Sequence, residues 1–245
     1  LRWICACYMS AARRFGEMDL EAPGVLPDQV RAWCKTMETT VDPLHALLEG
    51  ESLELDPEYA LVDHYRGVIF SSRGQHERAL EAQTAAVRKR REFKQAYYEQ
   101  ARALIGLNRP NEALKALDES LVIGLANPTA YLLRARLRLQ LGLSRAALND
   151  VKSARRLGYT NRSELSIVEA LCYAKLNDPE RAFEIYDRLL ELNPGHVDAL
   201  SNRGWLRMYH KRWEAAARDF RRFIELAPQH PQVEAARRFL RQCEQ

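Results

Sequence analysis

The sequence repeats itself about every 34 residues, and this period constrains the fold more than any other feature. Small residues inside apolar segments form a first row in phase, namely Gly67, Ala101, Ala135, Ala170 and Gly204. A row of alanines keeps the same spacings: Ala79, Ala113, Ala147, Ala182 and Ala216. Turn-type residues form a third row, Gly74, Asn108, Gly142 and Asn177, which Lys211 continues. Rows in phase over five units indicate a repeat protein, whose units bury their apolar faces by stacking on their neighbours.

Each unit has the pattern of two short helices joined by a tight turn. Apolar residues recur three or four residues apart over 128–141 and again over 145–157, which predicts a helix in each segment. Gly142 lies between them, where a helix end often needs a left-handed conformation. The same pattern predicts a helix over 213–226. No long segment alternates with a period of two, so we expect an all-α fold.

The pattern resembles tetratricopeptide repeats, which carry a small residue in the first helix, a Gly or Asn turn, an alanine early in the second helix and a closing proline. The resemblance covers five units, 60–93, 94–127, 128–161, 163–196 and 197–230. It implies a right-handed superhelical solenoid of antiparallel helix pairs. Arg66, Arg134 and Arg203 stand where the family usually has a semi-buried leucine. We expect them to reach solvent or to pair with carboxylates, because a buried unpaired arginine is costly.

The two ends of the chain are expected to differ from the repeats. Residues 231–245 place apolar residues on one face and three arginines outside it, which predicts an amphipathic helix that solvates the last pair. Residues 1–59 are interpreted as N-terminal helices, with a degenerate repeat or capping pair over 26–59. The chain begins with Leu1 rather than Met, so we expect a fragment or a processed form.

Composition and motifs argue against several function classes. Apolar residues make up 47% of the chain and charged residues 29%, which excludes a disordered protein. No window reaches the roughly 18 apolar residues of a membrane span. The five cysteines are irregularly spaced, and Cys5 and Cys7 have no second ligand pair at zinc-like spacing. We therefore expect reduced thiols, no metal and a cytoplasmic location, with a periplasmic or secreted one left open.

No sequence motif indicates an active site. Nucleotide-binding, metalloprotease and nucleophile-elbow motifs do not occur, so we expect neither enzymatic activity nor a cofactor. Paired carboxylates such as Asp118 and Glu119 lie in amphipathic segments and are expected to be solvated.

The family resemblance also implies a binding site. In tetratricopeptide repeat proteins the first helices line a concave groove that accepts extended or helical peptides. Carried over by register, the groove would contain His64, Tyr98, Arg102, Leu132, Arg136, Leu171, Lys175, Asn202, Trp205 and Tyr209. Aromatic rings and guanidinium groups suit a peptide with acidic and apolar residues. Family members that capture the acidic tails of chaperones do so with Lys, Asn and Arg on three successive first helices. Here the corresponding positions are His64, Val68, Glu99, Thr129 and Leu133, and an alignment that starts one repeat later fits no better. We therefore expect no capture of chaperone tails.

These observations favour a non-enzymatic protein–protein interaction scaffold or adaptor. Two alternatives remain open: the recognition or regulatory arm of a larger enzyme or regulator, and an RNA-binding solenoid. Arginine outnumbers lysine by 30 to 7, but the acidic residues are interspersed and the net charge is only +4, far from a strong basic footprint. The run from Arg88 to Arg91 could contact nucleic acid, although it also ends a helix, where cations complement the macrodipole.

Overall fold

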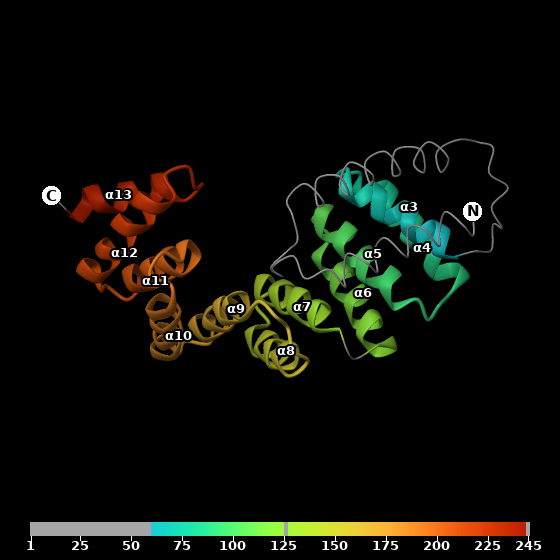
Figure 1. Ribbon diagram of the computed structural model, residues 1–245, viewed down its shortest axis with the longest axis horizontal. Helices are drawn as coiled ribbons and strands as arrows, with labels where there is room; N and C mark the ends of the chain where they lie inside the picture. The colour runs from blue at the N-terminus through green and yellow to red at the C-terminus, as the bar shows by residue number, and fades with distance from the viewer. Residues whose placement is uncertain (1–59, 125–126, 244–245) are drawn as a thin grey trace, which may run out of the picture. The chain divides into compact units, whose positions relative to one another are not determined.

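The computed structural model describes residues 60–124 and 127–243, and within these ranges every regular element is an α-helix (Figure 1). The first two repeats contain α3 (Ala60–Ser72), α4 (His76–Lys89), α5 (Lys94–Gly106) and α6 (Pro110–Ile123). The next three contain α7 (Pro128–Gln140), α8 (Ser144–Arg156), α9 (Arg162–Lys175), α10 (Pro179–Leu192), α11 (Val197–Tyr209) and α12 (Trp213–Leu226), and α13 (Val233–Cys243) follows. The expected all-α solenoid of helix pairs is therefore confirmed. The expectations for residues 1–59, including those for Cys5 and Cys7, lie outside the described residues.

Successive helices pack against each other as a repeat architecture requires. Each first helix contacts the second helix of its own repeat, and each second helix contacts the first helix of the next repeat. The helix predicted over 213–226 has the predicted bounds, while α7 and α8 each end one residue earlier than expected. Leu141 and Leu157 take the C-cap positions of those two helices. The sequence period therefore corresponds to one helix pair.

The turns between the two helices of a repeat all use one left-handed residue. The φ angle is positive at Gly74, Asn108, Gly142, Asn177 and Lys211. The next backbone N–H reaches back to a carbonyl five residues earlier, as where Leu143 N donates to Arg138 O at 2.7 Å. This is a Schellman motif, which glycine adopts without steric cost. The predicted row of turn residues is confirmed, and Lys211 takes a conformation, φ 59°, that side chains of its kind rarely adopt.

The two rows of small residues lie where larger side chains would clash. All of their members are buried. A Cβ atom added to Gly67 would lie 2.4 Å from Nε2 of Gln83, and one added to Gly204 would lie 2.8 Å from the ring of Phe220. A side chain at Gly67 would displace Gln83, and one at Gly204 would collide with the ring of Phe220. The small residues therefore allow the two helices of a repeat to pack closely.

The junction between the third and fourth repeats differs from the others because it holds one additional residue. The second helices of the other four repeats end at residues with φ between −138° and −146°. Helix α8 instead ends in a Schellman motif, with Gly158 at φ 77° and Tyr159 N donating to the carbonyl five residues earlier at 3.1 Å. This ending produces a loop over 158–161, after which the side chain of Asn161 caps α9.

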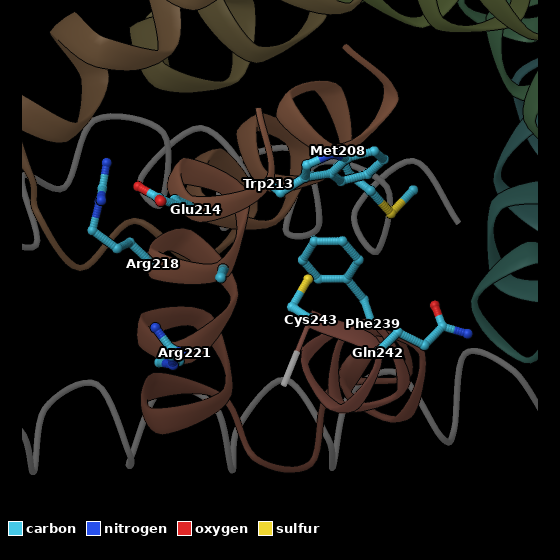
Figure 2. Close-up of a pocket in the computed structure, with 9 residues that line it drawn as sticks. Met208, Trp213, Glu214, Arg218, Arg221, Phe239, Gln242 and Cys243 are labelled. Atoms are coloured by element: carbon cyan, nitrogen blue, oxygen red, sulfur yellow. The ribbon is translucent and has the colours of Figure 1, made fainter. Parts of the chain in front are cut away.

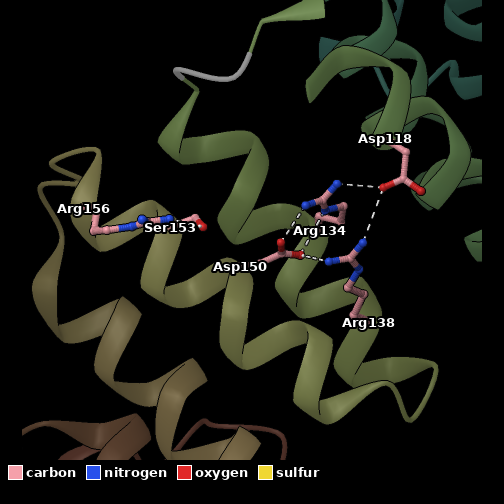
Figure 3. Close-up of polar contacts among 6 residues, drawn as sticks. All are labelled: Asp118, Arg134, Arg138, Asp150, Ser153 and Arg156. Atoms are coloured by element: carbon pink, nitrogen blue, oxygen red, sulfur yellow. Dashed lines mark hydrogen bonds and ion pairs between the residues drawn. The ribbon is translucent and has the colours of Figure 1, made fainter. Parts of the chain in front are cut away.

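Arginines that replace the family's leucines form an ion network between repeats (Figure 3). Arg134 lies 2.6 Å from Asp150 of its own repeat and 2.8 Å from Asp118 of the preceding one. Arg138 pairs with the same two carboxylates, at 2.7 Å and 3.5 Å. Arg66 also has a carboxylate, 3.8 Å away. The predicted pairing is confirmed. Asp118 is 47% exposed, in line with the expectation of a solvated carboxylate, and it also pairs with these two arginines of the next repeat.

The same network recurs two repeats later. Arg203 lies 2.6 Å from Asp219 and 2.5 Å from Asp187, and Arg207 lies 2.8 Å and 3.5 Å from the same carboxylates. Burial by itself would lower the pKa of Arg203, but hydrogen bonding and charge interaction with Asp219 outweigh it, so the pKa is raised. The arginine and aspartate positions follow their counterparts by 69 residues, as from Asp150 to Asp219. The sequence thus contains a double-repeat period as well as the single one.

Helix α13 covers the last helix pair. Its residues Val233, Ala236 and Phe239 are buried in one core cluster with Phe220 of α12. The amphipathic helix predicted over 231–245 is therefore confirmed as a capping helix, although it begins two residues later than expected. The cap supplies the apolar contacts that a further repeat would otherwise provide.

Candidate functional site

The residues predicted to line the groove all lie on the first helices of the repeats, α3, α5, α7, α9 and α11. Helix α3 contacts α5, α7 contacts α9, and α9 contacts α11 directly. Where first helices adjoin in this way, side chains on their shared side can contribute to one surface. The surroundings of the individual residues decide which of them are able to contact a partner.

His64 is held by its own repeat. Its Nδ1 atom lies 3.0 Å from Oε1 of Gln83, and Nε2 of Gln83 donates to the His64 carbonyl oxygen at 2.9 Å. The imidazole centroid is 4.8 Å from that of Phe93. These contacts tie α3 to α4 and to the start of α5. They give His64 a packing role.

Leu132 does not belong to an accessible surface. Its side chain is only 2% exposed and lies in the buried cluster that includes Leu165 and Val168 of α9. Burial of a leucine beside an apolar neighbour is favourable, so the next helix draws this side chain into the core. The assignment of Leu132 to the groove is therefore wrong. Tyr98 is half-buried, and this burial raises its pKa, an effect that the charge of Arg102 opposes.

Arg102 and Arg136 are the two accessible arginines of the predicted groove. Their side chains are 51% and 54% exposed. Arg102 lies 3.0 Å from Glu99 on its own helix, and Arg136 lies 2.6 Å from Oε1 of Glu164 on α9. A guanidinium group has five N–H donors, so each arginine retains donors for a partner's carboxylate. The hydroxyl of Tyr159 donates to the other oxygen of Glu164 at 2.6 Å.

Glu164 therefore connects three segments of the chain. The hydrogen bond to Glu164 raises the pKa of Tyr159 to about 12, helped by burial and by the charge of Glu164 and opposed by Arg136. The phenol stays protonated at neutral pH and remains a donor. Neither Tyr159 nor Glu164 was predicted as part of the site. The additional residue in the 158–161 loop was the one sequence signal that this junction differs from the others.

The C-terminal part of the predicted groove is more apolar. Leu171, Asn202 and Trp205 are half-buried, Lys175 is exposed, and Tyr209 is 78% exposed. The ring of Trp205 meets that of a buried phenylalanine edge-on, with centroids 4.7 Å apart. Its indole N–H is buried and has no hydrogen-bond partner among the described residues. An unsatisfied donor costs free energy, which a hydrogen bond to a partner would recover.

A cleft of about 820 Å³ lies between the end of α11, α12 and α13 (Figure 2). Figure 2 shows Met208 and Trp213 on one side of it, Phe239 on another, and Arg218 and Arg221 along α12. Trp213 is 49% exposed although it begins a helix of the last pair. None of these residues was predicted as part of a site, because the sequence register does not show that α11, α12 and α13 leave a cleft between them.

The part of the chain that the structure describes contains neither a cluster of metal ligands nor a helix able to span a bilayer. No cluster of three or more histidine, cysteine or acidic residues among residues 60–124 and 127–243 is arranged to hold a metal ion. None of the helices in these ranges combines the length and the apolar character of a bilayer span.

Known proteins match the chain in sequence pattern and in fold. One tetratricopeptide repeat family model matches residues 66–128 and 132–197, and a second matches residues 170–241. No curated protein matches the chain. The solved structures that resemble it include YrrB, described as a TPR protein with an unusual peptide-binding site. It is 23% identical with a TM-score of 0.61, over 74% of this chain and 93% of that one.

Two further solved structures resemble the chain to a similar degree. A MamA fragment from Desulfovibrio magneticus RS-1 is 17% identical with a TM-score of 0.63, over 71% of this chain and 97% of its own. PilF from Pseudomonas aeruginosa is 16% identical with a TM-score of 0.62, over 76% of this chain and 85% of its own. At these identities the likeness is one of fold.

Proposed function

Because the chain belongs to the tetratricopeptide repeat family, we propose that it is a non-enzymatic adaptor that binds a peptide or protein segment along the first helices of its repeats. Family membership supports a protein-interaction scaffold in general. The finer proposal is that the bound segment carries acidic side chains at one end and apolar side chains at the other.

The register of the first helices is the observation that supports this order. Arg102, Arg136, Leu171 and Trp205 occupy the same position in four successive repeats. The row thus begins with two arginines that are more than half exposed and ends with two half-buried apolar residues. Carboxylates of a partner would pair with the guanidinium groups, and its apolar side chains would pack on α9 and α11.

Charge reversal at the arginines tests the proposal. The groove variant carries Arg102→Glu and Arg136→Glu together. The control variant carries Arg145→Glu and Arg241→Glu, which change the net charge equally at exposed residues outside the groove. Each protein is used to capture partners from a lysate of the source cell, and bound proteins are identified by mass spectrometry. Circular dichroism and thermal melts check that both variants fold as the wild type does.

We expect a discrete protein that the wild type and the control retain and that the groove variant loses. A synthetic segment of that protein should then bind the wild type directly, with a weaker dependence on salt than nucleic acid would show. Unchanged capture by a folded groove variant would contradict the proposal. Nucleic acid that dissociates at moderate salt would instead support the RNA-binding alternative, because phosphate contacts weaken steeply as salt rises.

A further inference from the structure

A second cleft, of about 510 Å³, lies within the fourth repeat, between α9 and α10 and the end of α8. None of the residues that line it belongs to the predicted groove. Its lining residues on α9, among them Ser166, Glu169 and Tyr173, lie about three or four residues apart on one side of that helix. Leu171 and Lys175, which belong to the groove, lie on roughly the opposite side. A ligand in this cleft would therefore leave the groove free.

The internal repeat explains why the fourth repeat has this space. In the third repeat, Arg134, Arg138 and Asp150 join α7 to α8, and in the fifth repeat the equivalent set joins α11 to α12. The fourth repeat has Glu169, Tyr173 and Ile185 in the same register, and all three line the cleft. The third and fifth repeats thus have an ion network between their two helices, and the fourth repeat lacks it.

The rim of the cleft is rich in arginine. Arg155, Arg162, Arg181 and Arg188 all line it, against the carboxylates of Glu169 and Glu184. Arg155 is paired with Glu169 at 2.5 Å, and Arg181 lies 3.3 Å from the carboxylate of an aspartate in the preceding turn. Arg162 and Arg188 are exposed and have no ion-pair partner within the described ranges. The four arginines of the lining outnumber its two carboxylates, so the cleft has an excess of positive charge.

Apolar surface adjoins these arginines. Ile185 and Tyr173 are half-buried in the lining, and Leu192 at the end of α10 is 82% exposed. The guanidinium of Arg181 lies 5.5 Å from the centre of the Tyr173 ring. A bound phosphate ion or a nucleotide phosphate would use only the charges. A peptide with both carboxylates and an aliphatic side chain would use the charges and the apolar surface together.

We propose that this cleft is a second peptide-binding site, which takes an acidic segment of a protein partner. Carboxylates of the segment pair with Arg162 and Arg188, and an aliphatic side chain packs on Ile185 and Leu192. The chain would then bind partner segments at two independent places, the groove of the first helices and the cleft of the fourth repeat. The proposal does not depend on the groove, because the two sites share no residue.

Fluorescent peptides provide the test. The probe is a synthetic peptide in which glutamate alternates with leucine, and the matched probe has glutamine in place of glutamate. Anisotropy titrations are run on three proteins. They are the wild type, the cleft variant (Arg162→Glu and Arg188→Glu together) and the groove variant (Arg102→Glu and Arg136→Glu together). The two variants change the net charge equally, so each is the control for the other.

We expect the glutamate peptide to bind the groove variant and to lose about tenfold or more in affinity when Arg162 and Arg188 are then reversed in that background. Backbone NMR shifts on α10, which contributes no residue to the groove, should mark the bound peptide. Equal binding of the glutamine peptide, or shifts confined to the first helices around Arg136 and Trp205, would overturn the proposal. The latter result would still support the groove, so the two sites are judged separately.

A grafted variant gives a second test that does not rely on charge reversal at the rim. Lys152→Asp, Glu169→Arg, Tyr173→Arg and Ile185→Asp would copy the network of the third and fifth repeats into the fourth. We expect this variant to fold and to fill the cleft, with loss of peptide binding there. A folded graft that still binds the glutamate peptide through α9 and α10 would contradict the proposal.

Discussion

Asp150 has almost no contact with water, and its charge is compensated by two arginines of the preceding helix. Its side chain is 4% exposed and accepts hydrogen bonds from Arg134 and Arg138. Removal of one partner from a buried ion pair leaves the other charges uncompensated, which costs about 3–5 kcal/mol. Asp118 pairs with the same arginines but is 47% exposed, so water can replace it.

We therefore predict that Asp150→Ala lowers the free energy of unfolding by about 3–5 kcal/mol and Asp118→Ala by about 1 kcal/mol or less. Urea denaturation followed by circular dichroism measures both changes. Asp219→Ala should behave as Asp150→Ala does, because the fifth repeat has the same network. Equal effects of Asp150→Ala and Asp118→Ala would show that burial does not decide the cost.

The hydrogen bond between Tyr159 and Glu164 predicts a dependence on alkaline pH. The pKa of Tyr159 is raised from 10.0 to about 12 in the folded protein, so the fold favours the protonated phenol. The resulting stabilisation is complete below pH 10 and is lost as the pH rises towards 12. Glu164→Gln removes the charged acceptor and should return the pKa of Tyr159 towards 10. NMR titration of the Tyr159 ring measures the shift, with Tyr159→Phe to assign its signal.

Single residues show where sequence patterns stop being informative. The rows of small residues and of turn residues could be predicted, because each has one steric requirement that recurs in every repeat. The partners of Asp118 could not, because the arginines that bind it lie on a different helix pair. Leu132 was misassigned for a related reason. The register gives the side of α7 on which it lies, but only the apolar residues of α9 decide that it is buried.

The helices themselves were the most predictable level of the structure. Their ends are fixed by local features, such as the left-handed turn residue after each first helix, and predicted bounds differ from the observed ones by at most two residues. The ending of α8 was not predicted. It depends on Gly158, whose φ of 77° replaces the extended residue used by the other second helices. Tyr159 contacts Glu164 from the loop that this ending creates.

Lys211 is the element-scale exception that a substitution can test. It has φ 59° in the turn between α11 and α12, where the first and third repeats have glycine. A left-handed conformation costs a residue with a side chain roughly 1 kcal/mol, whereas glycine adopts it freely. Lys211→Gly should therefore stabilise the fifth repeat by up to about 1 kcal/mol and raise the thermal midpoint. Lys211→Ala removes the charge but keeps the Cβ atom, so it should not stabilise the repeat. If both substitutions stabilise it, the charge of Lys211 rather than its backbone conformation is the cause.

Among the described residues, the largest fully buried side chains lie in the last core cluster. The last core cluster contains Tyr186, Phe220 and Phe223, each at most 1% exposed. The clusters of the first two repeats consist mostly of alanine and leucine. Larger side chains bury more apolar area and stabilise their repeats more. Because each repeat contacts only its neighbours, the stability of the chain need not be uniform.

We predict that amide hydrogen exchange is slowest in α10 and α12 and fastest in α4 among the second helices. Exchange followed by mass spectrometry of peptic fragments resolves the individual helices. Phe220→Leu should reduce the protection of α12 and α13 but leave that of α4 unchanged. The same exchange rate in every helix would mean that the chain unfolds as one unit, and the predicted gradient would be wrong.

The double-repeat ion network sets a rule for shortening or lengthening the chain. If residues 128–196 were removed, Asp118 would face Arg203 and Arg207, and the network would form again across the new junction. If only residues 128–162 were removed, Asp118 would face Glu169, a carboxylate opposite a carboxylate. We expect the first deletion to fold and the second to melt at a lower temperature, although it removes fewer residues. These two outcomes would make two repeats, rather than one, the unit that can be removed or inserted in this protein.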